Sequence, residues 1–103
     1  MAIVIVQGEF EFKPEDRDAF LEGSVAGIRA SREDPGCLEY LYAADPTDPG
    51  RAILSERWES KEALDGHLTR VRSTPPDPNG PQRPTPLRSE ITVYEVAGTL
   101  SLG

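Results

Sequence analysis

The sequence predicts a single α+β domain of ferredoxin-like topology, in which two helices pack on one face of a four-stranded antiparallel sheet. Four segments have the alternation or the β-branched and aromatic composition of strands, and two carry apolar residues at helical spacing. They follow one another in the order strand, helix, strand, strand, helix, strand (β-α-β-β-α-β). A chain of 103 residues can bury one hydrophobic core, so residues 1–103 are expected to form one domain.

The first strand and the first helix are predicted within residues 2–32. The chain opens with AIVIV and then alternates polar and apolar residues up to Phe12, which is typical of a strand. Pro14 suits the first turn of a helix, where its missing N–H needs no partner. Leu21, Val25 and Ile28 recur at i, i+4 and i+7 and predict the buried face of this helix.

Gly23 and Gly27 lie inside the predicted helix, where each glycine costs about 1 kcal/mol relative to alanine. Two explanations are open at this point. The glycines allow the helix to pack closely on the sheet, or they leave room for a ligand beneath it.

The second and third strands form a predicted hairpin. Asp34-Pro35-Gly36 ends the helix, and residues 37–44 form the second strand. Its two faces carry Leu38, Tyr40 and Tyr42 on one side and Cys37, Glu39 and Leu41 on the other. The loop 45–50 is short and rich in Asp, Pro and Gly, so the third strand, 51–58, is expected to run antiparallel.

The second helix brings the only histidine to the same wall of the domain as the only tryptophan. Ser60 is a suitable N-cap, and Leu64, His67 and Leu68 follow at i, i+3 and i+4. This spacing puts His67 on the apolar face of the helix, close to the end of the third strand at Trp58.

Beyond this helix, the segment 70–88 is a predicted proline-rich loop. Residues 74–86 contain six prolines and cannot continue a helix. The loop is a linker or a lid, and its arginines make it the one locally basic part of the chain. Residues 89–97 alternate as a fourth strand, and residues 97–103 form a C-terminal arm.

The outer strands predict an association between copies of the chain. The first and fourth strands carry apolar residues on both faces, whereas two helices can cover only one face of the sheet. We therefore expect a homodimer joined sheet to sheet, with the arm crossing onto its partner.

Composition excludes several classes of function. A formal charge of −7 argues against nucleic-acid binding, which requires a basic face. One cysteine forms no internal disulfide, and no apolar run is long enough for a membrane span, so a cytoplasmic protein is expected. One His and one Cys supply no transition-metal site, and no glycine-rich loop follows a strand to bind a nucleotide cofactor.

Several short motifs resemble the antibiotic biosynthesis monooxygenase family. They are PGCLEY, the DPTDPGR turn, ERWES and ALDGHL, in this order and spacing. The resemblance covers residues 2–68 and resumes at 91–96. It implies a small dimeric α+β barrel that acts with O₂ on a hydrophobic quinol, anthrone or polyketide-like substrate, without metal or flavin.

The resemblance also implies roles for individual residues. His67 is the expected base, because an unperturbed imidazole has a pKa of about 6.5. Trp58 is expected to form an aromatic wall, with Gln7 and Tyr40 or Tyr42 as hydrogen-bond donors that orient the substrate.

Two substrate-binding positions depart from the anthrone-oxidising members of the family. Leu54 replaces their third-strand asparagine, and Leu64 replaces a tyrosine on the second helix. The substrate can therefore differ from theirs.

Other interpretations of these residues remain open. His67 and Trp58 also suit a structural core, and a Cys37–His67 pair is formally present. A non-catalytic dimeric module that binds a quinone-like ligand needs the same pocket. A haem-degrading branch of the family is a more distant alternative, because this chain has Gln7 and His67 where that branch has an asparagine and a tryptophan.

Overall fold

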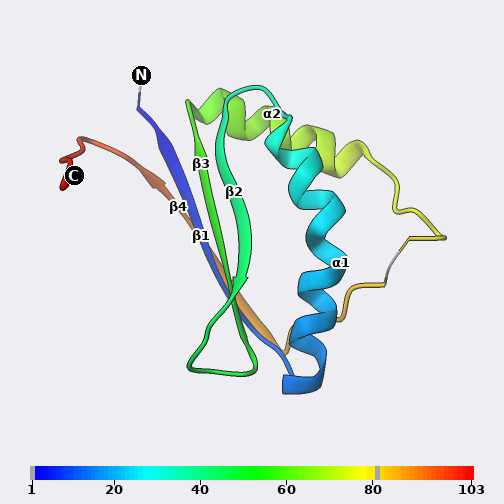
Figure 1. Cartoon of the computed structure of the whole chain (residues 1–103). Coiled ribbons are helices and arrows are strands. Elements are labelled where there is room, and N and C mark those ends of the chain that lie inside the picture. The colour runs from blue at the N-terminus through cyan, green and yellow to red at the C-terminus, as the bar shows by residue number, and fades with distance from the viewer. Residues whose placement is uncertain (1, 81) are drawn as a thin grey trace.

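The computed structural model describes residues 2–80 and 82–103, and Met1 and Pro81 lie outside the described residues. The strands are β1 (Val4–Glu11), β2 (Cys37–Ala44), β3 (Arg51–Trp58) and β4 (Arg88–Glu95), and the helices are α1 (Pro14–Arg32) and α2 (Lys61–Ser73) (Figure 1). The predicted α+β, ferredoxin-like order is confirmed. Within the described ranges, no helix combines the length and apolar character needed to cross a bilayer.

The sheet has the strand order β2-β3-β1-β4, and each neighbouring pair is antiparallel. Both helices lie on the same face of it (Figure 1). Between sheet and helices, the rings of Phe12 and Phe20 pack with their centroids 4.6 Å apart. The buried core comprises Val4, Val6, Phe10, Phe12, Phe20, Ala52, Leu54, Trp58 and Leu64.

The buried face of α1 differs in part from the predicted one. The buried side chains of this helix are Phe20, Ser24 and Ser31, whereas Val25 is 44% exposed. Leu21 and Val25 border a groove beside the edge strand β2. The apolar spacing identified the helix correctly, and Leu21 packs against the core while Ile28 lines the cavity over the sheet. Of the three predicted residues, Val25 alone is turned outward, and serines occupy the buried positions 24 and 31.

A β-bulge at the start of β2 changes the predicted faces of that strand. The ladder with β3 passes from Cys37 to Glu39, so Leu38 has no partner in it. Cys37 therefore pairs with Trp58 and packs against the core, while Leu38 is 43% exposed. Strict alternation predicts Cys37 and Glu39 on the same face. The extra residue of the bulge puts them on opposite faces instead.

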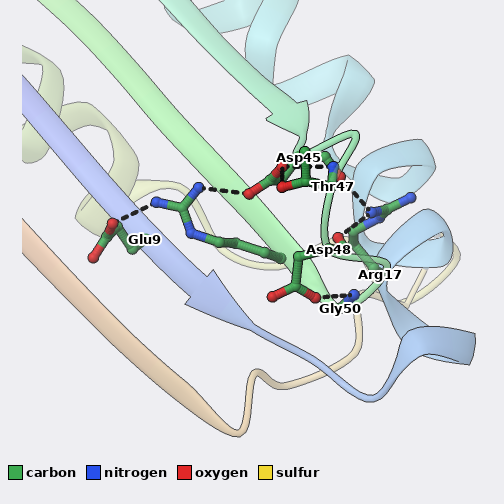
Figure 2. A network of polar contacts seen from close by, with 7 residues as sticks. Glu9, Arg17, Asp45, Thr47, Asp48 and Gly50 are labelled. Carbon is green, nitrogen blue, oxygen red and sulfur yellow. Dashed lines mark hydrogen bonds and ion pairs between the residues drawn. The ribbon is translucent and has the colours of Figure 1, made fainter.

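The loop 45–50 between β2 and β3 is held by its own polar groups and by α1 (Figure 2). Asp45 Oδ1 accepts hydrogen bonds from the backbone N–H and the hydroxyl of Thr47, at 2.8 and 2.7 Å. Arg17 on α1 donates to the carbonyl oxygen of Asp48 at 2.8 Å. These contacts fix the hairpin, and with it the register of β2 against β3.

The sheet face away from the helices is mixed in character, which corrects the expectation of an apolar face. Gln7 lies between Ser55 on β3 and Thr92 on β4. Ser55 Oγ also donates to Glu39 Oε1 at 2.6 Å. A polar row therefore crosses the middle of this face.

The exposed apolar residues of β4 lie largely on the other face. Ile91 and Val93 pair with Gly8 and Val6, so their side chains point to the helix side, where they are 56% and 49% exposed. They remain exposed because the helices extend over β2 and β3 and leave β4 uncovered (Figure 1).

Gly36→Ala is expected to lower the free energy of unfolding by about 1–3 kcal/mol. Gly36 has a φ of +82°, and a Cβ there would lie 2.5 Å from the Cβ of Ala63. Gly66 on α2 is the matched control, because a Cβ there meets nothing within 4 Å. Gly66→Ala should stabilise the helix by about 1 kcal/mol in the same urea unfolding measurement. Equal effects of the two substitutions would contradict this account of Gly36.

Candidate functional site

A cavity of about 840 Å³ lies between the sheet, the two helices and the proline-rich segment. Its sheet wall is largely apolar and is formed by Val6, Leu54, Ile91 and Val93, with Tyr40, Tyr42 and Glu56 beside them. The helices contribute Gly23, Ser24, Ala26, Gly27, Ile28 and Ser31 from α1 and Leu64, His67, Leu68, Arg70 and Val71 from α2. This volume is in the usual range for small-molecule sites.

The proline-rich segment forms one side of the cavity, as expected of a lid rather than of a free linker. Residues 74–77, Gly80, Gln82 and Arg83 line it. Arg83 Nη1 donates to Ser24 Oγ at 3.0 Å, and its guanidinium carbon lies 5.0 Å from the centre of the Phe20 ring. The segment is therefore attached to α1 by one arginine.

His67 is held by a carboxylate from the turn after α1. Its Nδ1 lies 2.7 Å from Asp34 Oδ2. Because an ionised carboxylate only accepts hydrogen bonds, Nδ1 carries the proton. Nε2 has no hydrogen-bond partner among the described residues. Every fully buried side-chain N or O atom of those residues has a partner, so Nε2 is not fully buried. Nε2 is therefore open to the cavity that His67 lines, with a lone pair free to accept a proton.

Arg70 keeps Asp34 ionised. Its Nε and Nη2 donate to the two carboxylate oxygens at 2.6 and 3.0 Å. Burial alone would raise the pKa of Asp34, but the hydrogen bonds from Arg70 and His67 outweigh it and lower this pKa below its ordinary value. The arrangement is a carboxylate that orients a histidine, as in general acid–base sites.

A second carboxyl group lies near His67. Glu56 is 5% exposed and lines the cavity, and its Oε1 accepts a hydrogen bond from Trp58 Nε1 at 2.9 Å. Burial raises the pKa of Glu56, and the hydrogen bond from Trp58 opposes that rise, as does the positive charge of His67 when its ring is protonated. Glu56 is therefore more easily protonated than an ordinary glutamate.

The two tyrosines of β2 add polar atoms to an otherwise apolar wall. The Tyr40 ring lies 5.3 Å from the His67 ring and 6.1 Å from the Tyr42 ring, measured between centroids. Burial raises the pKa of Tyr40, helped by the neighbouring Tyr42 and Glu56. Tyr40 is therefore a neutral phenol that can donate a hydrogen bond to a bound anion.

Five of the predicted site residues line this cavity, and two do not. His67, Tyr40, Tyr42, Leu54 and Leu64 line it. Trp58 is fully buried behind His67, with ring centroids 4.7 Å apart, so it supports the imidazole instead of forming a wall of the site. Gln7 is on the opposite face of the sheet and does not face the cavity, because the alternation of β1 turns it outward.

Sequence reasoning missed Asp34, Glu56 and Arg70. Every second residue of β3, Leu54, Glu56 and Trp58, points inward. An acid at a buried position is costly unless it has a partner, so Glu56 could have been identified from the sequence. Asp34 had no such signal, because its partner His67 is 33 residues away.

The two glycines of α1 favour the second of the open explanations, space beneath the helix. Both line the cavity. A Cβ at Gly27 would meet nothing within 4 Å, and one at Gly23 would lie 2.8 Å from the Arg83 side chain. Neither glycine is required for contact between α1 and the sheet.

Cys37 is not part of the cavity. It borders a separate depression with Arg32 and Tyr40, and burial raises the pKa of its thiol. It is therefore not poised as a thiolate nucleophile. Across residues 2–80 and 82–103, no three His, Cys, Asp or Glu side chains are grouped so that they could hold a metal ion.

Asp34→Asn is expected to lower the free energy of unfolding by about 1–3 kcal/mol at pH 7, because the amide loses charge-assisted hydrogen bonds to Arg70 and His67. The pKa of Asp34 is lower in the folded chain than in the unfolded one. Its contribution is therefore complete above about pH 4 and is lost as the pH falls through the folded value. Urea unfolding at a series of pH values should show the difference from wild type shrinking in acid, and a difference independent of pH would contradict the ion pair.

Glu56→Gln is the matched comparison, and its effect on the free energy of unfolding should have the opposite sign. The amide oxygen still accepts from Trp58, but there is no buried charge to form. Because the pKa of Glu56 is raised, its carboxyl group stabilises the fold below the unfolded pKa, and that stabilisation is lost as the pH rises toward the folded value. The stability of the variant relative to wild type should therefore increase as the pH rises above about 4.

Comparisons with known proteins find relatives of this chain in sequence and in fold. The sequence profile of the family described as antibiotic biosynthesis monooxygenase matches residues 3–72. An uncharacterized Synechocystis protein, sll1783, is 29% identical over 102 residues, which cover 96% of this chain and 67% of that protein.

Solved structures have the same fold. A Deinococcus radiodurans protein, provisionally named as an antibiotic biosynthesis monooxygenase, is 20% identical with a TM-score of 0.71, covering 97% of this chain and 98% of its own. Rv0793 from Mycobacterium tuberculosis is 25% identical with a TM-score of 0.65, covering 96% and 99%. With its profile match over residues 3–72, this chain belongs to the antibiotic biosynthesis monooxygenase family.

Proposed function

We propose that this chain is a monooxygenase that oxidises a flat, hydrophobic quinol, anthrone or polyketide-like substrate with O₂, without metal or flavin. One observation carries the proposal. His67 presents Nε2 to a largely apolar cavity of about 840 Å³, while Asp34 holds its other ring nitrogen. Membership of the family supports the reaction class.

The proposed reaction begins with transfer of a proton from the substrate to Nε2 of His67. The resulting anion gives one electron to O₂, and the two radicals combine to form the C–O bond of a hydroperoxide. Loss of water from the hydroperoxide leaves a carbonyl group, so one oxygen atom enters the product and the other leaves as water. The proton held by His67 leaves with that water.

The other groups of the cavity have supporting roles in this scheme. The phenol of Tyr40 donates a hydrogen bond to the substrate anion. Glu56 assists the departure of water as a second proton carrier. The apolar wall with Leu54 and Leu64 excludes bulk water and accepts a flat ring system.

A binding module without turnover is the second candidate, and one observation favours it. Leu54 and Leu64 both line the cavity at positions where anthrone-oxidising relatives carry polar side chains. A site with fewer hydrogen bonds to a substrate anion is better suited to holding a quinone-like ligand than to oxidising it.

Oxygen uptake with a panel of quinols and anthrones separates the two functions. Wild type should consume O₂ above the uncatalysed rate, and His67→Gln should reduce kcat about 10²–10⁴-fold, because the base is lost. Asp34→Asn should reduce kcat by a smaller factor and change its pH profile, because it removes the orienting carboxylate. The exposed Thr69→Ala on α2 is the control and should retain wild-type activity.

Ligand-dependent thermal stabilisation with no O₂ uptake by wild type would establish the binding module instead. Oxygen uptake that His67→Gln leaves unchanged would remove His67 from the reaction.

We also propose that two copies of the chain form a homodimer. The exposed apolar side chains of Leu41, Ile53 and Tyr94 on the sheet face away from the helices support this, as do Leu100 and Leu102 in the arm, which are 97% and 105% exposed. The arm extends beyond its own sheet (Figure 1). A surface of this kind is more typical of an interface than of a monomer.

The mass of one chain is 11.3 kDa, and light scattering at micromolar concentration should give twice this value. Removal of residues 99–103 should weaken the association without unfolding the domain, because the arm makes few contacts with it. A mass of one chain for the full-length protein at this concentration would refute the dimer.

A further inference from the structure

Arg83 is a cation built into the cavity at a distance from His67. The stem of its side chain passes over Gly23, where a Cβ would lie 2.8 Å from Arg83 Cγ. Its Nη1 is bonded to Ser24 Oγ at 3.0 Å, and its guanidinium packs over the Phe20 ring. Ser24 is 2% exposed and its own hydroxyl donates to the carbonyl oxygen of Phe20 at 2.7 Å, so this support for Arg83 is fixed.

The guanidinium of Arg83 has no acidic partner in the part of the chain that the structure describes. The other cavity arginine, Arg70, is neutralised by Asp34. Two acids line the cavity, and both accept hydrogen bonds from other groups. Glu56 accepts one from Trp58 Nε1, and Asp77 Oδ1 accepts one from the backbone N–H of Asn79 at 2.9 Å. Neither lies within 4.0 Å of Arg83.

The unused N–H groups of Arg83 can therefore bind an acceptor from outside the chain. An arginine has five N–H donors in a planar fork that matches a carboxylate. Among residues 2–80 and 82–103, its side chain makes one hydrogen bond, from Nη1 to Ser24 Oγ.

The length of α1 indicates how far apart Arg83 and the candidate base His67 lie. Arg83 contacts α1 at Ser24, while His67 is held by Asp34, which follows the C-terminal end of α1. Ser24 and Ser31 both line the cavity and are seven residues apart, which corresponds to about 10 Å along a helix. This length is close to that of three fused six-membered rings.

We propose that Arg83 binds an anionic group of the substrate, at the end of the cavity away from His67. The preferred ligand is then an elongated aromatic carboxylic acid of about three fused rings, with its acidic C–H or hydroxyl group at His67 and its carboxylate at Arg83. This inference rests on the proposed function and specifies its substrate class. It also explains a cation in the cavity of a chain whose net charge is −7.

The test compares two ligands that cannot be oxidised further, anthraquinone-2-carboxylate and anthraquinone-2-carboxamide, by isothermal titration calorimetry. Wild type should bind the carboxylate about 10–100-fold more tightly than the carboxamide, as expected for a charge-assisted contact. Arg83→Gln should abolish this preference and leave the carboxamide affinity unchanged. Arg83→Lys should retain part of the preference, and Arg72→Gln, an exposed arginine outside the cavity, should retain all of it.

Equal binding of the two ligands by wild type, or no binding of the carboxylate, would overturn the proposal. So would an Arg83→Gln variant that loses affinity equally for both ligands, because that result assigns Arg83 to packing of the proline-rich segment. Since neither ligand is turned over, the outcome is independent of catalysis. A carboxylate preference without O₂ uptake keeps this site and rejects the monooxygenase, whereas O₂ uptake without the preference does the reverse.

Discussion

The carboxylate of Asp34 joins the two helices and orients the candidate base. It follows α1 in the chain, and it accepts two hydrogen bonds from Arg70 on α2. Its side chain is 9% exposed, and a carboxylate so buried is stable only with such partners. The contacts that fix the end of α1 against α2 therefore also fix the His67 ring, so the packing of the helices and the geometry of the site depend on the same group.

The cavity exists because the helices do not fill the space above the sheet. The underside of α1 carries Ser24, Gly27 and Ser31, which line the cavity and are too small to fill it. Neither helix extends over β4, so Ile91 and Val93 remain available to a ligand. The proline-rich segment closes part of this space, since proline prevents α2 from continuing and sends the chain back across α1.

Local patterns predicted much of the fold and part of the site. The predicted hairpin and the helical spacing in α2 placed Trp58 and His67 on the same wall of the domain. The structure has the Trp58 and His67 rings 4.7 Å apart, on the wall where the sequence placed them. Alternation turns Glu56 inward in β3 and Gln7 outward in β1, so both could have been assigned from the sequence. The family resemblance drew attention to Gln7 instead.

The sequence by itself determined the order and the approximate limits of the six elements, because these depend on periodicity, proline and glycine over a few residues. Only the tertiary structure decided that Asp34 meets His67 and Arg70, which are 33 and 36 residues further along the chain. It also decided that α1 faces the sheet with serines and glycine instead of Val25. The reason is physical: which side chains meet depends on how the helices lie on the sheet, and no local pattern contains that information.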